Sequence, residues 1–366
     1  MSKSSSCKNG MLPFRQMWYS IYERVILIIW KGIIVMTPIT AFEGHYEGEA
    51  AVWLKAGRYE AAILPGIGGN LICFRDTESG YRFLHEPGAE EMEAFKANPG
   101  IHGIPVLFPP NRYEDGEFPW NGQTYHLPVN EAKTGNHLHG FLHTAAWEVE
   151  EFGTGTSESF VTVAIKVDEN HPSYQYLPFK YTIKLRYTLG EGGLSQQLLV
   201  HNDGDVLMPC LLAFHTAINA PFAPGSSAQD YRVKVTIGER WELSSDRMLP
   251  TGKFQELTAD EVALRGEGVY PFYASMDNHY TAAAQNGRNR MELTDRKAGV
   301  TLVYDVGTSY KQWMIWNNGA TEGFFCPEPQ INLVNAPKVD LPADDIGLFG
   351  LEPGEYWEES SRIYVK

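Results

Sequence analysis

The stretch YTIKLRYTL, residues 181–189, alternates apolar and polar side chains at every position. A strand with one buried face shows this period of two, because successive side chains point to opposite faces of the sheet. The same pattern recurs in residues 160–167 (FVTVAIKV), 231–237 (YRVKVTI) and 300–306 (VTLVYDV). These segments predict β-strands that are each buried on one side.

Short turns separate the predicted strands, among them residues 191–193 (EGG), 202–204 (NDG) and 353–354 (PG). Residues 89–97 (AEEMEAFKA) form the one stretch with a clear helical character. Strands without intervening helices build antiparallel sheets, which pack as a sandwich or close into a barrel. We therefore expect an all-β domain with few short helices.

A glycine-rich stretch, residues 65–70 (PGIGGN), has some likeness to a phosphate-binding loop. However, Leu71 stands where the third glycine of a dinucleotide fingerprint belongs, and the following LICF is strand-like rather than helical. This stretch predicts a tight turn between two strands.

Charge and cysteine content restrict the class of protein. The 366 residues carry a net charge of −15 and no basic run, which argues against a nucleic-acid partner. Cys7, Cys73, Cys210 and Cys326 lie far apart without a C-x-x-C pair. This spacing favours free thiols in a reducing compartment, so we expect a cytoplasmic protein. We also expect a monomer or a homodimer.

The N-terminal region contains an apolar stretch, residues 17–36, that is interrupted by Glu23, Arg24 and Lys31. Its uninterrupted apolar runs are too short for a spanning helix, which needs about 20 residues. A peripheral anchor, a terminal element packed on the domain and a translated leader remain as interpretations. We divide the chain into an N-terminal extension, residues 1–36, and a single domain, residues 37–366.

Three histidines, His137, His139 and His143, lie within seven residues in the stretch GNHLHGFLH. On a strand, His137 and His139 would point to the same face, and with His143 they could bind zinc, iron or copper. They could equally act in acid–base chemistry or be ordinary structural residues. The pattern alone leaves these three interpretations open.

Five motifs, taken in order along the chain, bear on the choice between these interpretations. They are GIPVLFPPNR, with Asn111 and Arg112 at its end; NHLHG around His139; the isolated His215 after an apolar run; EPQ beginning at Glu328; and LEPGE near the C-terminus. In this order they resemble the aldose 1-epimerase (mutarotase) family, over residues 45–366. The resemblance implies the large antiparallel β super-sandwich of the galactose mutarotase type.

The resemblance also implies roles for individual residues. Glu328 matches the general base that removes the proton of the anomeric hydroxyl, and His215 matches the general acid at the ring oxygen. His139 matches the other active-site histidine, which orients the sugar. The substrate-binding set that the motifs suggest is Asn111, Arg112, His137 and Asp277. Such acid–base chemistry needs neither a metal nor another cofactor.

One departure from the family pattern concerns the substrate. Phe141 follows His139-Gly140 where free-sugar mutarotases usually have a second glycine, and H-G-F is similar to the hexose-6-phosphate branch. A phosphate site should add a cluster of basic residues, and Arg75 or Lys133 could join Arg112 for this purpose. We favour an unphosphorylated aldohexose. A hexose-6-phosphate mutarotase, a non-catalytic carbohydrate-binding protein and a metal enzyme using the three histidines are the alternatives.

Overall fold

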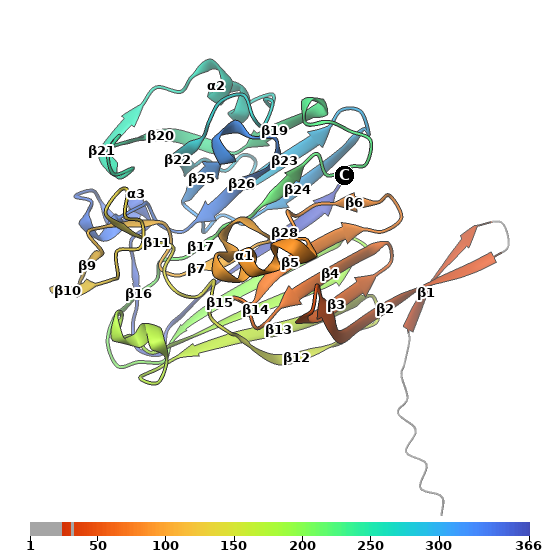
Figure 1. The fold of residues 1–366 in the computed structure, drawn as a ribbon, viewed down its shortest axis with the longest axis horizontal. Helices are drawn as coiled ribbons and strands as arrows, with labels where there is room; N and C mark the ends of the chain where they lie inside the picture. The colour runs from red at the N-terminus through yellow and green to blue at the C-terminus, as the bar shows by residue number, and fades with distance from the viewer. Residues whose placement is uncertain (1–23, 31–32) are drawn as a thin grey trace, which may run out of the picture.

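The computed structural model describes residues 24–30 and 33–366 and consists mainly of antiparallel strands (Figure 1). A six-stranded sheet contains the first strands of the chain. Its members, in spatial order, are β1 (Arg24–Trp30), β2 (Ile33–Tyr46), β3 (Glu49–Ala56), β4 (Tyr59–Leu64), β5 (Asn70–Asp76) and β6 (Tyr81–Arg82). Each strand pairs with its neighbour in sequence, which makes the sheet a simple meander.

An eight-stranded sheet packs against this meander through β12–β14, which contact β2–β4. Its members, in spatial order, are β12 (Glu148–Thr154), β13 (Glu158–Val167), β14 (Tyr181–Gly190), β15 (Gly193–Asn202), β28 (Tyr356–Val365), β24 (Val300–Asp305), β23 (Arg290–Asp295) and β19 (Tyr231–Val235). The C-terminal strand β28 lies between β15 and β24, so it joins two parts of the chain that are distant in sequence.

A second eight-stranded sheet carries most of the side chains discussed below. Its members are β21 (Pro250–Gln255), β20 (Ile237–Leu243), β22 (Asp277–Ala282), β25 (Gln312–Trp316), β26 (Gly323–Gln330), β17 (Ala213–Phe214) and β7 (Val106–Leu107), with β18 (Ile218–Ala220) also paired to β26. Three two-stranded ladders join β8 (Arg112–Glu114) to β11 (Asn136–Leu138), β9 (Glu117–Trp120) to β10 (Gln123–His126), and β16 (Met208–Pro209) to β27 (Gly350–Leu351).

The described helices are short. They are α1 (Met92–Ala97), α2 (Ala259–Arg265) and α3 (Ala343–Ile346), and a 3-10 turn at Ala89–Glu91 leads into α1. Within the described part of the chain, no helix is both long and apolar enough to cross a bilayer. The all-β fold with few short helices is confirmed.

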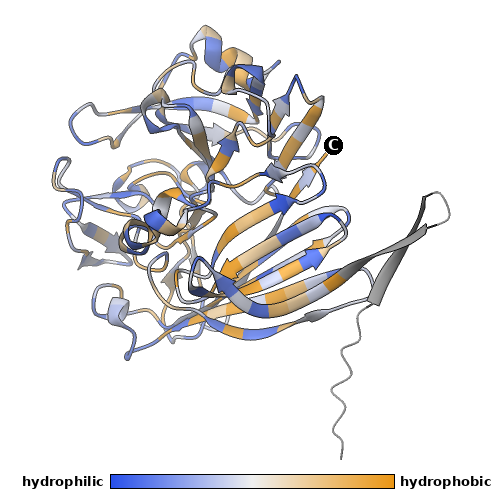
Figure 2. Ribbon diagram, turned by 45° about the vertical axis from the view of Figure 1, so that its right-hand side comes forward, coloured by the Kyte–Doolittle hydropathy of each residue, from blue (hydrophilic) through white to orange (hydrophobic). Residues whose placement is uncertain are grey.

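Alternating burial accounts for the strands that the sequence predicts. In β14 every second residue from Tyr181 to Leu189 is buried and the intervening ones are half-exposed. Figure 2 shows the corresponding alternation of apolar and polar positions along the long strands. The predicted strands at residues 160–167 and 300–306 coincide with β13 and β24 within two residues. Residues 231–237 differ, because the strand breaks at Thr236 between β19 and β20.

The predicted turn at residues 65–70 joins β4 to β5. Gly68 and Gly69 both have positive φ, and a Cβ on Gly68 would lie 2.4 Å from the carbonyl oxygen of His143. The glycines therefore serve a tight turn that packs against the histidine-rich segment.

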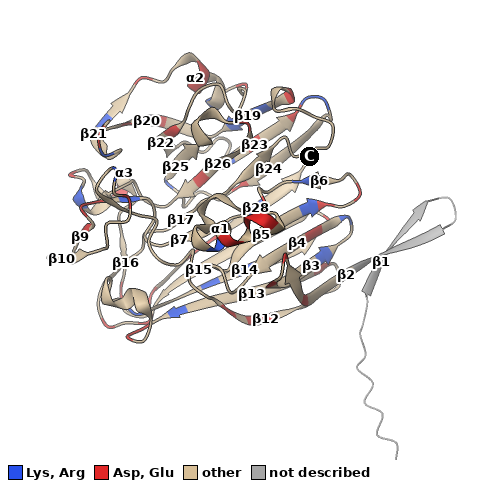
Figure 3. Ribbon diagram, viewed as in Figure 1, with Lys and Arg blue, Asp and Glu red and all other residues tan. Residues whose placement is uncertain are grey.

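The predicted boundary between residues 36 and 37 falls inside β2, whose pairing with β3 begins at Thr40. Residues 1–23 and 31–32 of the predicted extension, with Cys7, lie outside the described residues, so the division stays a prediction. Cys73, Cys210 and Cys326 are buried free thiols. Lys and Arg positions are dispersed among Asp and Glu positions over the ribbon (Figure 3).

Candidate active site

Two residues with left-handed backbone shape the turn around the histidine motif. Asn111, just before β8, has φ 60°, and His139, just after β11, has φ 69°. The backbone N–H of His139 donates to the carbonyl oxygen of Asn111 at 2.9 Å, which ties the two turns together. Non-glycine residues with this backbone cost on the order of 1–3 kcal/mol each and cluster at functional sites.

Gly140 has a packing reason to be glycine. Its φ is 63°, and a Cβ at this position would lie 2.2 Å from the carbonyl oxygen of Phe108. Any other side chain would force this loop away from the strand end at Phe108. The H-G pair in the NHLHG motif is therefore explained by backbone geometry: the histidine takes a strained turn and the glycine permits close approach.

A pocket of about 210 Å³ opens beside this turn. Six of the predicted site residues line it: Asn111, Arg112, His139, His215, Asp277 and Glu328. They come from segments that are up to 217 residues apart in sequence (328 − 111), and the pairing of β22, β25, β26 and β17 brings the later ones together. Six of the seven predicted catalytic and binding residues thus share one cavity.

Sequence reasoning did not select the remaining lining residues, which are Asn98, Gly100, Ile101, Leu138, Met314 and Trp316. The signal for Met314 and Trp316 was present, because alternate residues of a strand share a face and both lie on β25. Asn98, Gly100 and Ile101 belong to the 3-10 turn Pro99–Ile101 and its cap, and no comparable pattern of residues marks this turn.

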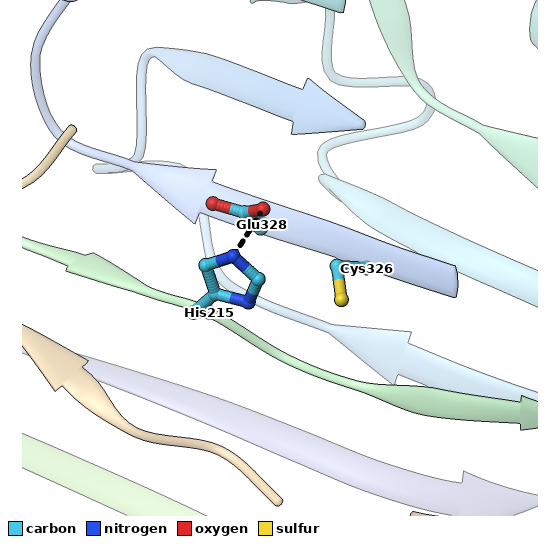
Figure 4. Close-up of side chains that lie close together, drawn as sticks. All are labelled: His215, Cys326 and Glu328. Atoms are coloured by element: carbon cyan, nitrogen blue, oxygen red, sulfur yellow. Dashed lines mark ion pairs between the residues drawn. The ribbon is translucent and has the colours of Figure 1, made fainter. Parts of the chain in front are cut away.

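At the wall of the pocket, His215 and Glu328 form a close buried pair. The Nε2 atom of His215 lies 3.2 Å from Oε1 of Glu328, and the side chains are 8% and 2% exposed (Figure 4). Glu328 lies on β26, with Gln330 on the same face at 3.5 Å from its other oxygen. The arrangement joins a carboxyl group and an imidazole at hydrogen-bond distance.

Burial alters the proton affinity of both groups. It raises the pKa of the Glu328 carboxyl well above its usual range; Asp277 adds to this effect and Arg112 opposes it. Burial also lowers the pKa of His215 to about 4, and His143 contributes in the same direction. Removing charge from water disfavours the ionised form of each group, so the pair shares one proton over a wide pH range.

The pocket also carries a charged network centred on Arg112. Its guanidinium donates to both oxygens of Glu131, at 3.0 and 3.1 Å, and to Oδ2 of Asp277 at 3.2 Å. Although burial opposes the charge, Asp277 and Glu131 raise the pKa of Arg112 above its usual value. Arg112 therefore stays ionised, and its two carboxylate partners fix its orientation.

His139 lines the same pocket, next to His215. Its ring centroid is 5.2 Å from that of His215 with the planes at 90°. Burial lowers its pKa well below the usual histidine value, and His215, His143 and Arg112 reinforce the shift. A neutral imidazole at this position can donate and accept one hydrogen bond each, as a sugar hydroxyl requires.

His137 does not join the other predicted residues in the pocket. Its side chain is buried, with Nδ1 2.7 Å from the carbonyl oxygen of Pro128 and the ring packed near Phe141. The expectation that His137 and His139 share a face is wrong, because β11 ends at Leu138 and His139 adopts left-handed backbone. Strand alternation does not continue across such a residue.

The predicted histidine triplet also fails to converge as a metal site. Among the described residues, one group of three potential ligands has its ligand atoms within 4.8 Å of one another, and it consists of His215, Cys326 and Glu328. The rings of His139 and His143 are 6.3 Å apart between centroids. The geometry therefore does not favour the metal enzyme built on His137, His139 and His143.

Comparison with known proteins agrees with this geometry. The family model described as aldose 1-epimerase matches residues 51–364. The chain belongs to the aldose 1-epimerase family. A galactose mutarotase-like protein from Clostridium acetobutylicum has 31% sequence identity and a TM-score of 0.86, with 90% of this chain and 98% of that chain covered.

Two further relatives were found. A galactose mutarotase-like protein from Lactobacillus casei has 18% identity and a TM-score of 0.64, covering 86% of this chain and 100% of that chain, which supports the fold alone. The uncharacterized Escherichia coli protein YihR is 34% identical over 173 residues, which are 47% of this chain and 50% of YihR. The alignment thus spans about half the length of that curated relative.

Within the aldose 1-epimerase family, Phe141 suggested the hexose-6-phosphate branch. In the structure Phe141 does not line the pocket with the acid–base pair. Its ring stacks on Tyr176, with centroids 5.2 Å apart and planes at 6°. Arg75 pairs with Glu60 and Glu86 on the six-stranded sheet, and Lys133 is exposed, so neither joins Arg112 at the pocket. These positions supply no phosphate-binding cluster.

Proposed function

We propose that this chain is an aldose 1-epimerase that interconverts the α and β anomers of an unphosphorylated aldohexose. The observation that carries the proposal is the buried contact between His215 and Glu328 at the wall of a small pocket. A carbohydrate-binding protein without catalysis would have no need of an acid and a base at hydrogen-bond distance. Membership of the aldose 1-epimerase family supports the same reaction class.

In the proposed reaction, the Glu328 carboxylate takes the proton of the anomeric hydroxyl while protonated His215 gives a proton to the ring oxygen. The bond between C1 and the ring oxygen breaks, and the open aldehyde rotates about the C1–C2 bond. Closure on the other face reverses both transfers: Glu328 returns its proton to the carbonyl oxygen, and His215 accepts the proton of the attacking hydroxyl. Each positioned acid or base contributes about 10²- to 10⁴-fold to the rate.

The protonation states of the pair suit this cycle. A neutral pair (carboxylic acid with neutral imidazole) and an ionised pair (carboxylate with imidazolium) hold the same single proton. Burial favours the neutral pair, whereas sugar hydroxyls donating to Glu328 would favour the carboxylate. The 3.2 Å contact gives the proton a direct route between the two groups. Substrate binding can therefore generate the reactive form without exchange with solvent.

The remaining pocket residues have binding roles in this proposal. Arg112 and Asp277 hold sugar hydroxyls as an oriented donor and acceptor, and Asn111 extends this polar wall. His139 orients the sugar next to His215. Trp316, which lines the same cavity, offers an aromatic face to the apolar side of the sugar ring.

The pocket also favours a neutral monosaccharide over a phosphosugar. Its volume of about 210 Å³ lies below the range of roughly 300–1,000 Å³ that is typical for larger drug-sized ligands. Arg112 is the basic side chain among its lining residues, and two carboxylates already pair with it. A phosphate would face the unfavourable charge of Glu131 and Asp277.

Polarimetry on freshly dissolved α-D-glucose and α-D-galactose tests the proposal. The purified protein should accelerate equilibration with and without a chelator. Glu328→Gln should lose this acceleration, whereas Glu358→Gln, at an exposed position on β28, should retain it. Glucose 6-phosphate and galactose 6-phosphate are assayed separately in the same way as alternative substrates. Acceleration of the phosphosugars alone would contradict the assignment to free aldoses, and retained activity in Glu328→Gln would contradict the catalytic assignment.

A further inference from the structure

We propose that His215, Cys326 and Glu328 form a binding site for a thiophilic divalent cation, represented by Zn²⁺ or Cd²⁺, and that its occupation inhibits the enzyme. Figure 4 shows the three side chains grouped around β26 and the end of β17. The proposal of a binding site depends only on the geometry of these three side chains. The inhibitory effect rests on the proposed function.

The three ligand atoms already lie close together. One imidazole nitrogen of His215, the Sγ atom of Cys326 and a carboxylate oxygen of Glu328 are within 4.8 Å of one another, and all three residues are buried. Cys326 and Glu328 are two residues apart on β26, so the strand presents both side chains on one face. His215 approaches that face from β17, which pairs with β26.

The donor set matches the preferences of a thiophilic cation. Zinc binds thiolate sulfur at about 2.3 Å and histidine nitrogen or carboxylate oxygen at about 2.0–2.2 Å. In a tetrahedral site such bond lengths place ligand atoms roughly 3.3–3.7 Å apart. The contact between His215 and Glu328, at 3.2 Å, is already close to this spacing. The thiol needs a shift of about 1 Å, which a side-chain rotation can supply.

A cation can reach this group from the pocket, because His215 and Glu328 both line it. Cys326 lies behind them in a small apolar cluster with Ala217 and Phe324. Three protein ligands leave a fourth coordination position, and the pocket is on the side from which water or a sugar hydroxyl could fill it. Open sites of this kind keep three protein ligands and one exchangeable ligand.

Occupation of this site would remove both proton-transfer groups from the proposed reaction. The cation would take the lone pair of His215 and the carboxylate of Glu328, which then could neither give nor accept a proton. It would also place positive charge where the substrate must donate a hydroxyl proton. The expected consequence is inhibition that appears at low cation concentration and is reversed by a chelator.

Titration with Cd²⁺ tests the site independently of activity. Thiolate coordination produces a ligand-to-metal charge-transfer absorption in the ultraviolet, which should appear with one equivalent of Cd²⁺. All proteins in the experiment carry Cys7→Ala, because Cys7 lies outside the described residues and has a thiol of its own. Cys326→Ala is compared with Cys210→Ala, a buried thiol on another part of the fold.

Cys326→Ala should abolish the absorption. It should also raise the Cd²⁺ concentration that halves the metal-free rate of the same variant by more than about 100-fold. The reason is that loss of an outer-shell partner alone costs about 10–100-fold in metal affinity. Cys210→Ala should behave like its parent. Cys326→Ser, checked by circular dichroism, replaces Cys326→Ala if the latter does not fold.

An absorption that persists in the Cys326 variants, or equal inhibition of all proteins, would overturn the site. Cadmium binding through Cys326 in a protein that epimerises no aldose would support the site and overturn the proposed function instead. The two proposals therefore fail in different measurements.

Discussion

The Nε2 atom of His215 lies 3.2 Å from Oε1 of Glu328, although β17 and β26 are more than 100 residues apart in the chain. Both side chains are nearly excluded from water, at 8% and 2% exposure. Burial disfavours the charged form of each group when the other group is neutral. The two groups therefore act as a unit that holds one proton. Two consequences for the reaction depend on this relationship.

The first consequence is a pH profile with a low acid limb. The pair of His215 and Glu328 already holds one proton. Uptake of a second proton leaves neither group able to act as the base, and burial lowers the pKa of His215 to about 4. His139 and His143 beside His215 oppose a further positive charge, and Arg112 faces the Glu328 side. We expect kcat/KM to stay level through neutral pH and to fall only as pH approaches about 4. Polarimetric rates, corrected for spontaneous mutarotation, measure this; an acid limb centred near 6.5, the ordinary histidine value, would contradict it.

The second consequence is non-additivity between the two residues. His215→Gln and Glu328→Gln should each lower kcat by about 10²- to 10⁴-fold. Because either change leaves the other group without its proton partner, the double variant should be scarcely slower than the worse single one. Single-variant losses that multiply in the double variant would show that the two residues act separately.

A separate prediction concerns substrate binding and rests on the hydrogen bonds of Arg112. Arg112→Lys replaces a guanidinium that spans Glu131 and Asp277 with a single ammonium group, which cannot make the same paired hydrogen bonds. A lost hydrogen bond to a charged group costs about 1.5–3 kcal/mol, so KM should rise roughly 10- to 100-fold with a smaller change in kcat. Initial-rate polarimetry over a range of sugar concentrations separates the two. A fall in kcat at unchanged KM would place Arg112 in the chemical step instead.

Both the strands and the site residues could be predicted from the sequence, but for different reasons. Alternation in β14 reflects burial of one face, which is a local property of the chain. Glu328 and His215, in contrast, have no local pattern that marks them as partners. Their selection depended on the order of motifs that the family shares, and their contact depends on the pairing of β17 with β26.

The errors have local physical causes. His137 was in the predicted substrate-binding set but does not line the pocket, and the left-handed backbone at His139 ends the strand alternation that would place the two histidines on one face. The break at Thr236 was missed because its hydroxyl bonds to Asn289, a partner 53 residues away. The turn containing Asn98 and Ile101 contributes to the pocket through tertiary packing alone. Such long-range contacts leave no periodic signal in a single sequence.

Phe141 provides a test of substrate preference. Because its ring stacks on Tyr176 rather than lining the pocket, Phe141→Leu should change kcat/KM for glucose and for glucose 6-phosphate by the same factor. Loss of an aromatic pair worth about 0.5–1.5 kcal/mol should appear as lower stability instead. Paired assays of both sugars, with thermal unfolding of the same variant, check this. A selective gain or loss for the phosphosugar would show that Phe141 controls specificity.

Buried histidines should make the folded chain sensitive to acid. Neither ring nitrogen of His279 has a hydrogen-bond partner, and burial, with Arg112 adding to it, lowers its pKa to about 3. In the unfolded chain the ordinary value is about 6.5, so the unfolded state takes up a proton between these two values and the folded state does not. Stability should therefore fall as pH decreases from about 6.5 towards 3, and at pH 5 His279 alone accounts for about 2 kcal/mol of the loss.

His279→Leu should reduce the difference in unfolding free energy between pH 7 and pH 5 by about that amount, whatever its effect on stability at pH 7. Urea unfolding at both pH values measures the difference, and His126→Gln, at an exposed position on β10, is the matched control. Comparing the pH dependence rather than the absolute stability removes the packing cost of the substitution. An unchanged pH dependence in His279→Leu would mean that His279 does not resist protonation in the folded protein.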